Sequence, residues 1–196
     1  MNPIRITVQA YILDLLPQNV GRQPQQPRTP SQGQQLQSLA NGLALPSFWS
    51  PNEINDAFTL ANHIWDQAKI EFTPVNISRR TEVVPADENG MWIHFVNRLS
   101  PRWGIAVAFV FDLPSNEGGW GGGRIAAVAG AKAIGALAGY QGRILAHELG
   151  HILLNTPNHE SSPSNLMFGQ RHPRVATADL LEPRQITAAR TRAQTL

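Results

Sequence analysis

The sequence predicts an α+β fold, because segments with helical periodicity and segments with strand periodicity both occur along one chain. Two segments, 50–68 and 143–154, carry apolar residues at helical spacing. Two others, 4–16 and 105–111, are alternating or nearly continuous apolar runs, as strands are. The length of 196 residues and the hydrophobic content of 42% suit a single domain with its own core.

The N-terminal segment predicts a strand followed by a long loop. Apolar residues alternate with others from Ile4 to Ile12, and Pro17 ends the strand. Residues 18–46 are then dominated by Gln, Pro, Ser and Gly, which predicts a loop insertion. This insertion is either an ordinary surface loop or an arm that binds a partner or covers a cleft.

The first long helix is expected to begin at Ser50. Ser50 suits the N-cap, Pro51 the first turn and Glu53 the reciprocal position of a capping box. An apolar stripe at helical spacing then continues to Ala68. His63 has no second ligand three or four residues away, which favours a surface or packing role over a metal site.

After this helix, strands are expected at 70–77, 81–84, 91–96 and 105–111. The last of these is almost entirely apolar, which predicts a buried central strand. Segment 91–96 alternates, as a strand with one core face and one surface face would. Residues 118–123 include five glycines, which predict a flexible or tightly folded loop.

A further strand is expected directly before the second long helix, and its residues are Arg124, Ile125, Ala126, Ala127 and Val128. Its position suggests the rim of a cleft. An edge strand at such a rim could bind an extended peptide by strand addition. The five residues are therefore candidate substrate-binding residues.

The second long helix carries the pattern His-Glu-x-x-His, formed by His147, Glu148 and His151. Residues four apart on a helix lie about 40° apart around its axis, so both imidazoles can reach one metal ion. Glu148 can then reach a water on that ion as a general base, which is the arrangement of a zinc hydrolase. Leu145 and Leu149 fall on the opposite side of the helix, which predicts a core face and a separate histidine face.

A catalytic zinc site normally has three protein ligands and leaves one position for water. Residues 155–158 break the helix, and His159 follows eight residues after His151. A sharp reversal can carry His159 back beneath the two helical histidines. Glu160 and the more distant His172 are competing candidates for the third ligand.

Residues 164–167, which read Ser-Asn-Leu-Met, add a family resemblance. A His-Glu-x-x-His helix, a chain reversal, a third histidine and this segment together resemble the metzincin metalloproteases. The resemblance implies that Met167 forms a methionine turn beneath a zinc site of His147, His151 and His159. The methionine would be an apolar floor and not a ligand.

The same resemblance implies a fold and an activity. The fold is a twisted mixed β-sheet with two long helices in an upper lobe of about residues 1–155. A small lower lobe of about residues 156–196 ends in a helix. The activity is that of a zinc-dependent endopeptidase with one catalytic Zn²⁺ ion, in which Glu148 assists the attack of a zinc-bound water on a peptide bond. The implied partner is a peptide or protein substrate.

The segment after the motif departs from the metzincin pattern. The family usually has a glycine three residues after the second histidine and its third histidine six residues after it, where this chain has Leu154 and Pro157. The reversal must therefore be built from residues 155–158, with Asn155 as the best candidate for a left-handed conformation. Gly169 stands where some members have a tyrosine.

Composition excludes several other functions. The net charge is +2 and the 16 Lys and Arg residues are scattered, which argues against a nucleic-acid surface. The chain has no cysteine, which excludes disulfides and thiolate metal ligands. No membrane span is expected, and residues 1–16 do not have the pattern of a signal peptide. A soluble monomer is expected, while its cellular location stays open.

Three other functions remain alternatives at this point. The first is a metal-stabilised binding or interaction domain without turnover, against which the intact Glu148 argues. The second is a zinc hydrolase of a non-peptide amide, and the third is a domain without a metal. A gluzincin-type zinc site would need a distant glutamate such as Glu182, which is less suited because Pro183 follows it.

Overall fold

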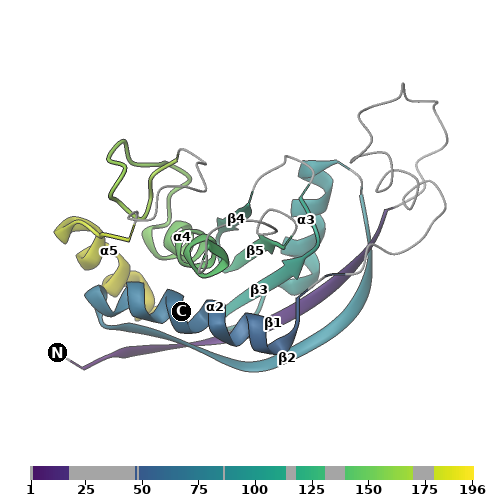
Figure 1. Cartoon of the computed structure of the whole chain (residues 1–196), viewed down its shortest axis with the longest axis horizontal. Coiled ribbons are helices and arrows are strands. Elements are labelled where there is room, and N and C mark those ends of the chain that lie inside the picture. Colours follow the sequence, from purple (N-terminus) through teal and green to yellow (C-terminus); the bar gives the residue numbers. More distant parts are fainter. Residues whose placement is uncertain are drawn as a thin grey trace.

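The structure is a computed structural model, and it describes residues 2–17, 47, 49–85, 87–113, 118–130, 140–169 and 179–196. The predicted loop insertion at 18–46 lies outside the described residues, and so does His172. Figure 1 shows the described chain as one sheet with helices packed around it.

The sheet has five strands in the order β2-β1-β3-β5-β4. Their bounds are β1 Ile4–Pro17, β2 Ile70–Val84, β3 Ile105–Val110, β4 Gly119–Gly122 and β5 Ile125–Ala129. Neighbouring strands are parallel from β2 through to β5, and only β4 runs antiparallel, to β5. The sheet is therefore mixed, with β2 at one edge and β4 at the other.

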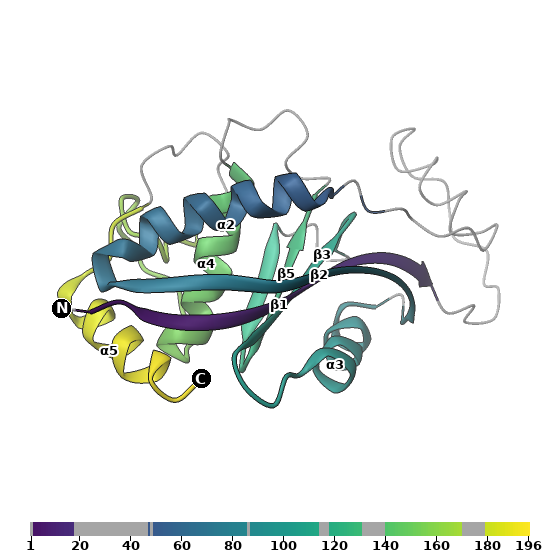
Figure 2. The same cartoon turned by 90° about the horizontal axis from the view of Figure 1, so that it is seen from below.

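Four α-helices are described, together with a short 3-10 turn, η1 Asp66–Ala68. The helices are α2 Pro51–Trp65, α3 Glu88–Leu99, α4 Tyr140–Leu154 and α5 Pro183–Ala193. Figure 2 shows α2 and α4 on one face of the sheet and α3 on the other, with α5 near the N-terminal end of β1. No helix in the described part of the chain is long and apolar enough to cross a membrane.

Strand β3 lies in the middle of the core, as its apolar sequence predicts. All six of its residues are buried. Ile105, Val107 and Phe109 pack into the core on the α2 and α4 side, whereas Ala106, Ala108 and Val110 pack on the α3 side. This period of two is what a strand covered on both faces requires.

Helix α2 begins as predicted and then positions α4. The Glu53 backbone N–H donates to Ser50 Oγ at 3.3 Å, and the Ser50 N–H donates to Glu53 Oε2 at 2.8 Å, which completes the capping box. At the other end, the buried indole N–H of Trp65 donates to the Ala146 carbonyl at 3.1 Å. The histidine-bearing helix is thereby fixed against α2.

The prediction of a strand at 91–96 is wrong, because this segment lies within α3. Asp87 caps the helix by accepting a hydrogen bond from the Gly90 N–H at 2.8 Å. The side chains that α3 buries are spaced four apart: Met91, Phe95 and Leu99. Ile93, which a strand would have buried beside Met91, is 57% exposed. The apolar residues of this segment fit both periods, and packing against the sheet selects the helix.

Three predictions about the strands of the sheet also need correction. The glycine-rich segment is not a loop throughout, since Gly119–Gly122 form strand β4. Segment 125–129 is not an edge strand, because β5 pairs with β3 on one side and with β4 on the other. The strands predicted at 70–77 and 81–84 form one continuous strand, β2.

Candidate metal centre

Helix α4 has the two faces that its sequence predicts. Leu145, Leu149 and Ile152 are fully buried in the core on the α2 side. His147 and His151 lie on the opposite side of the helix, where His147 is half-buried and His151 is 7% exposed. The apolar face anchors the helix, and the other face is left for the histidines.

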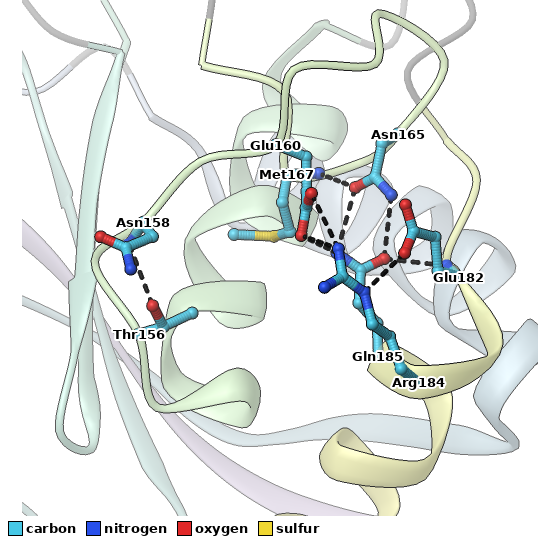
Figure 3. Close-up of polar contacts among 8 residues, drawn as sticks. All are labelled: Thr156, Asn158, Glu160, Asn165, Met167, Glu182, Arg184 and Gln185. Carbon is cyan, nitrogen blue, oxygen red and sulfur yellow. Dashed lines mark hydrogen bonds and ion pairs between the residues drawn. The ribbon is translucent and has the colours of Figure 1, made fainter.

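The chain reverses directly after α4, as the sequence predicts. Asn155 has a φ of 49°, which is the left-handed conformation that asparagine tolerates. The Thr156 N–H donates to the His151 carbonyl at 3.3 Å, and the Thr156 Oγ1 then accepts the Asn158 N–H at 3.1 Å (Figure 3). This turn brings His159 back beneath His147.

The three histidines meet at their Nε2 atoms. His147 Nε2 lies 3.1 Å from His151 Nε2 and 3.2 Å from His159 Nε2. The ligand atoms of all three lie within 4.8 Å of one another, and together they could hold a metal ion. For ligands 2.0–2.1 Å from zinc in tetrahedral geometry, the expected nitrogen separation is about 3.4 Å. The observed separations are close to this value.

Backbone carbonyls determine which nitrogen of each helical histidine carries the proton. His147 Nδ1 lies 2.7 Å from the Leu166 carbonyl oxygen, and His151 Nδ1 lies 2.8 Å from that of Thr156. A carbonyl oxygen only accepts, so each Nδ1 holds the proton and each Nε2 presents a lone pair. Two lone pairs 3.1 Å apart repel each other unless a cation lies between them, so the donor set fits a metal.

Burial keeps these imidazoles neutral. Removal from water lowers the pKa of His147 to about 4, against the opposing effect of its hydrogen bond to Leu166. Burial likewise lowers the pKa of His151. Near pH 7 neither ring carries a second proton, which leaves both Nε2 lone pairs free for a metal ion.

Glu148 places a buried carboxyl group next to the first histidine. The residue is 6% exposed, and burial raises its pKa to about 8. Its side chain lies against β4, because a Cβ built on Gly119 would be 2.8 Å from Glu148 Oε1. Burial by itself therefore favours the protonated carboxyl group near pH 7, and a cation held by the neighbouring histidines would favour the carboxylate that a general base requires.

The other candidates for the third ligand lie elsewhere. The Glu160 carboxylate accepts two hydrogen bonds from Arg184 Nη2, at 2.9 and 3.0 Å. Glu182 accepts from Arg184 Nε at 2.6 Å. Neither carboxylate belongs to the histidine cluster. Within the described residues, His159 is therefore the candidate that the structure brings to His147 and His151.

Met167 packs against α4, the helix beneath which the metzincin resemblance implies an apolar floor. It is 1% exposed, and a Cβ built on Gly150 would be 2.3 Å from Met167 Sδ. Gly150 is a poor helix former, and this contact explains why it is there. Gly169 likewise leaves room for the His159 ring, since a Cβ on Gly169 would be 2.7 Å from that ring.

Strand β4 passes so close to α4 that side chains cannot fit between them. A Cβ built on Gly119 would be 2.6 Å from Glu148 Cγ, and one built on Gly121 would be 2.2 Å from the Glu148 carbonyl oxygen. These alternate glycines face the helix, whereas Trp120 packs on the α3 side against Trp92, with ring centroids 6.0 Å apart. Within the described residues β4 is an edge strand of the sheet, and the face that it turns toward α4 lies against Glu148.

Because of this close approach, a Gly121→Ala substitution is expected to destabilise the fold by about 2 kcal/mol, since strand and helix must move apart. Such a loss lowers Tm by about 4–8 °C in a domain of this size. Gly122→Ala is the matched control in the same strand, because its Cβ would be 3.6 Å from Trp92 at ordinary contact distance. Thermal unfolding of the two variants in the presence of a chelator measures the difference. Equal melting temperatures would contradict the packing of β4 on α4.

The strand predicted to bind substrate, at 124–128, is not at an edge of the sheet. Ile125, Ala126, Ala127 and Val128 are at most 1% exposed, and both edges of β5 are paired. The Arg124 guanidinium donates to the backbone carbonyls of three residues away from the histidines: Arg102, Thr195 and Leu196. An added strand could therefore pair with β4 but not with β5.

Sequence reasoning missed the residues that hold the site from outside. They are the backbone carbonyls of Thr156 and Leu166, which accept protons from the histidines, and the glycines Gly119 and Gly121, which contact Glu148 on α4. Backbone acceptors leave no trace in a sequence, because every residue has one. The alternate glycines did offer a signal, since glycine within a strand often marks close approach of another backbone.

Comparison with known proteins identifies the fold but no sequence family. No protein-family model matches the chain, and its sequence matches no curated protein. An archaemetzincin from Methanopyrus kandleri is similar in structure, with a TM-score of 0.52 and 10% identity over 95% of this chain and 96% of that one. The prediction of a metzincin-like α+β fold is confirmed.

A chain in a structure of a chaperone–substrate complex is also similar, with a TM-score of 0.51 and 13% identity. The match covers 100% of this chain but only 35% of the other chain, so this protein spans about a third of that relative. At these identities the likeness is one of fold. The archaemetzincin-like fold and the three-histidine cluster together support a zinc hydrolase.

Proposed function

We propose that this protein is a zinc-dependent endopeptidase of the metzincin type, with residues 1–196 forming a single catalytic domain. In this proposal the part before about residue 155 provides the sheet and α4, and the part after it provides the third ligand and the floor. The observation that carries the proposal is the orientation of the histidines. Both helical histidines donate their Nδ1 protons outward to carbonyls, so that three Nε2 atoms converge beside Glu148.

The donor set favours zinc. Three neutral imidazoles are the protein ligands of a catalytic zinc site that leaves one coordination position open. A zinc ion held by His147, His151 and His159 supplies Lewis acidity, which polarises a carbonyl group and lowers the pKa of water towards 7. Met167 closes the site from below as an apolar methionine turn, in contact with α4 at Gly150.

Glu148 is the proposed general base. It takes a proton from the attacking water and passes it to the amine that leaves when the peptide bond breaks. Burial raises the pKa of this carboxyl group to about 8, so burial alone favours the acid form, and a zinc ion held beside it would favour the carboxylate that accepts the proton. Its place on α4, one residue after His147, keeps it beside the metal ligands.

Strand β4 ends the sheet within the described part of the chain, and this supports a peptide as the substrate. An extended peptide can add to an exposed edge through main-chain hydrogen bonds. On this sheet such a peptide would run along Gly119–Gly122, directly beside Glu148. This edge takes the place of segment 124–128 as the proposed substrate-binding strand.

The proposal is tested by metal analysis and a peptide-library digest of the purified protein. We expect about one zinc ion per chain, cleavage of internal peptide bonds, loss of cleavage after chelation and its return when zinc is added back. Zinc binding without cleavage of peptides or other amides would indicate a metal-stabilised binding domain. Cleavage of small amides alone would indicate a non-peptide hydrolase, and protein without zinc affinity would overturn the proposal.

A further inference from the structure

We propose that Gln185, on helix α5, is a positioning residue for the metal centre. Its hydrogen bonds would fix the relative positions of the two segments that orient His147 and His159. This inference rests on the proposed function, because it assumes that the three histidines bind zinc. Gln185 itself is 4% exposed and does not belong to the histidine cluster.

The amide of Gln185 uses its full hydrogen-bonding capacity (Figure 3). Its Oε1 accepts from Asn165 Nδ2 at 2.9 Å and from the Glu182 N–H at 2.8 Å. Its Nε2 donates to Asn165 Oδ1 and to Glu160 Oε1, both at 3.3 Å. The side chain therefore has one orientation, and it joins three parts of the chain: the start of α5, the segment at Asn165 and the segment at Glu160.

One arm of this network leads to the first histidine. Asn165 is 3% exposed, and its Oδ1 also accepts the Met167 N–H at 2.8 Å. The side chain of Asn165 thus fixes the backbone on both sides of Leu166. The Leu166 carbonyl is the group that accepts the His147 Nδ1 proton at 2.7 Å.

The other arm leads to the third histidine. The Glu160 N–H donates to the Met167 carbonyl at 2.7 Å, and Glu160 forms a parallel bridge with Phe168. Glu160 directly follows His159, so fixing its backbone and its carboxylate fixes where the His159 ring enters the site. Gln185 is bonded to both arms, which makes it the shared support of the two ligands.

The exposed neighbour Arg184 is the weaker candidate for this role. Its side chain is 69% exposed, and it pairs with Glu160 and Glu182 from the solvent side. Exposed ion pairs contribute little, because water and salt screen them. Asn165 and Gln185 are both buried, so losing one amide leaves the other with unsatisfied groups. The buried pair should therefore determine the ligand geometry.

The test compares zinc affinity in three variants of the full chain. Gln185→Met keeps the volume and removes all four hydrogen bonds. Asn62→Leu is the matched control, because the Asn62 amide also joins two elements, through the Phe72 backbone at 2.7 and 3.0 Å, away from the histidines. Arg184→Met removes the exposed pairs. Zinc dissociation constants come from competition with a chromogenic chelator, and melting of the metal-free proteins reports stability separately.

We expect Gln185→Met to weaken zinc binding by about 10- to 100-fold, as changes in groups that orient metal ligands do. Asn62→Leu and Arg184→Met should keep the wild-type affinity within about twofold, although Asn62→Leu lowers the melting temperature. Wild-type affinity in Gln185→Met, or an equal loss in Asn62→Leu, would overturn the positioning role and leave the zinc site intact. A wild-type protein that binds no zinc would overturn the proposed function and this inference with it.

Discussion

A Glu148→Gln protein is expected to bind zinc as the wild type does and to lose peptide hydrolysis by about 10²- to 10⁴-fold, the usual contribution of a general base. Glutamine keeps the size of the side chain in its contact with Gly119, so the packing of β4 on α4 is preserved. It cannot accept the proton of the attacking water, and so the chemical step fails. Turnover of an internally quenched peptide and the zinc content of the same preparation measure the two effects.

Glu82→Gln provides the control for this result. Glu82 is also buried, at 8% exposed, but it lies near the C-terminal end of β2, away from the histidine cluster, and pairs with His94 Nε2 at 3.2 Å. This variant should keep full turnover. Full turnover by Glu148→Gln would rule out Glu148 as the base.

A His159→Ala protein is expected to bind zinc at least about 100-fold more weakly, because a three-ligand site loses one ligand. The fold should survive, since His159 is exposed and stands outside the core. Its Nε2 atom lies 3.2 Å from that of His147, so the substitution removes a ligand atom from the histidine cluster itself. Zinc titration against a chelator measures the change, and circular dichroism checks the fold.

His63→Ala serves as the comparison, because His63 is an exposed histidine on α2. It should leave zinc affinity unchanged. Wild-type affinity in His159→Ala would move the third ligand to Glu160 or His172. His172→Ala would then distinguish these two, since it would weaken zinc binding only if His172 is the ligand.

Local sequence signals predicted those parts of the fold that local physics determines. The capping box at Ser50, the buried strand at 105–111 and the two faces of α4 depend on neighbouring residues. The left-handed turn at Asn155 was also predictable, because few residue types tolerate that backbone conformation. Each of these features lies within a few residues of its cause.

The errors lie where tertiary packing overrides a local pattern. The apolar residues at 91–96 fit both a strand and a helix. Packing of Met91 and Phe95 against the sheet stabilises the helix. The glycines at 119 and 121 locally favour a loop, because the contact that requires them in a strand is with helix α4, which comes later in the chain. Burial of segment 125–129 likewise depends on β4 as its partner.

For the metal centre, the sequence indicated the donors but not what orients them. The motif at 147–151 and the candidate at His159 gave the three imidazoles that the structure brings together. The proton positions on His147 and His151 depend on the Leu166 and Thr156 carbonyls. The positions of these carbonyls depend on the turn after α4 and on side-chain amides such as that of Asn165. Such contacts follow only from the folded backbone.

The short span of the ligands bears on how zinc would act on folding. His147, His151 and His159 fall within one stretch of thirteen residues, so an unfolded chain keeps all three imidazoles near one another. A ligand stabilises a fold only by the excess of its affinity for the native state over that for the denatured state. In this protein the higher zinc affinity of the native state would come from the fixed orientation of the imidazole rings, because the closeness of the ligands in sequence is the same in the denatured state. The rise in melting temperature on adding zinc would therefore measure ring orientation, and a variant that loosens the rings would lose that rise while still binding the ion.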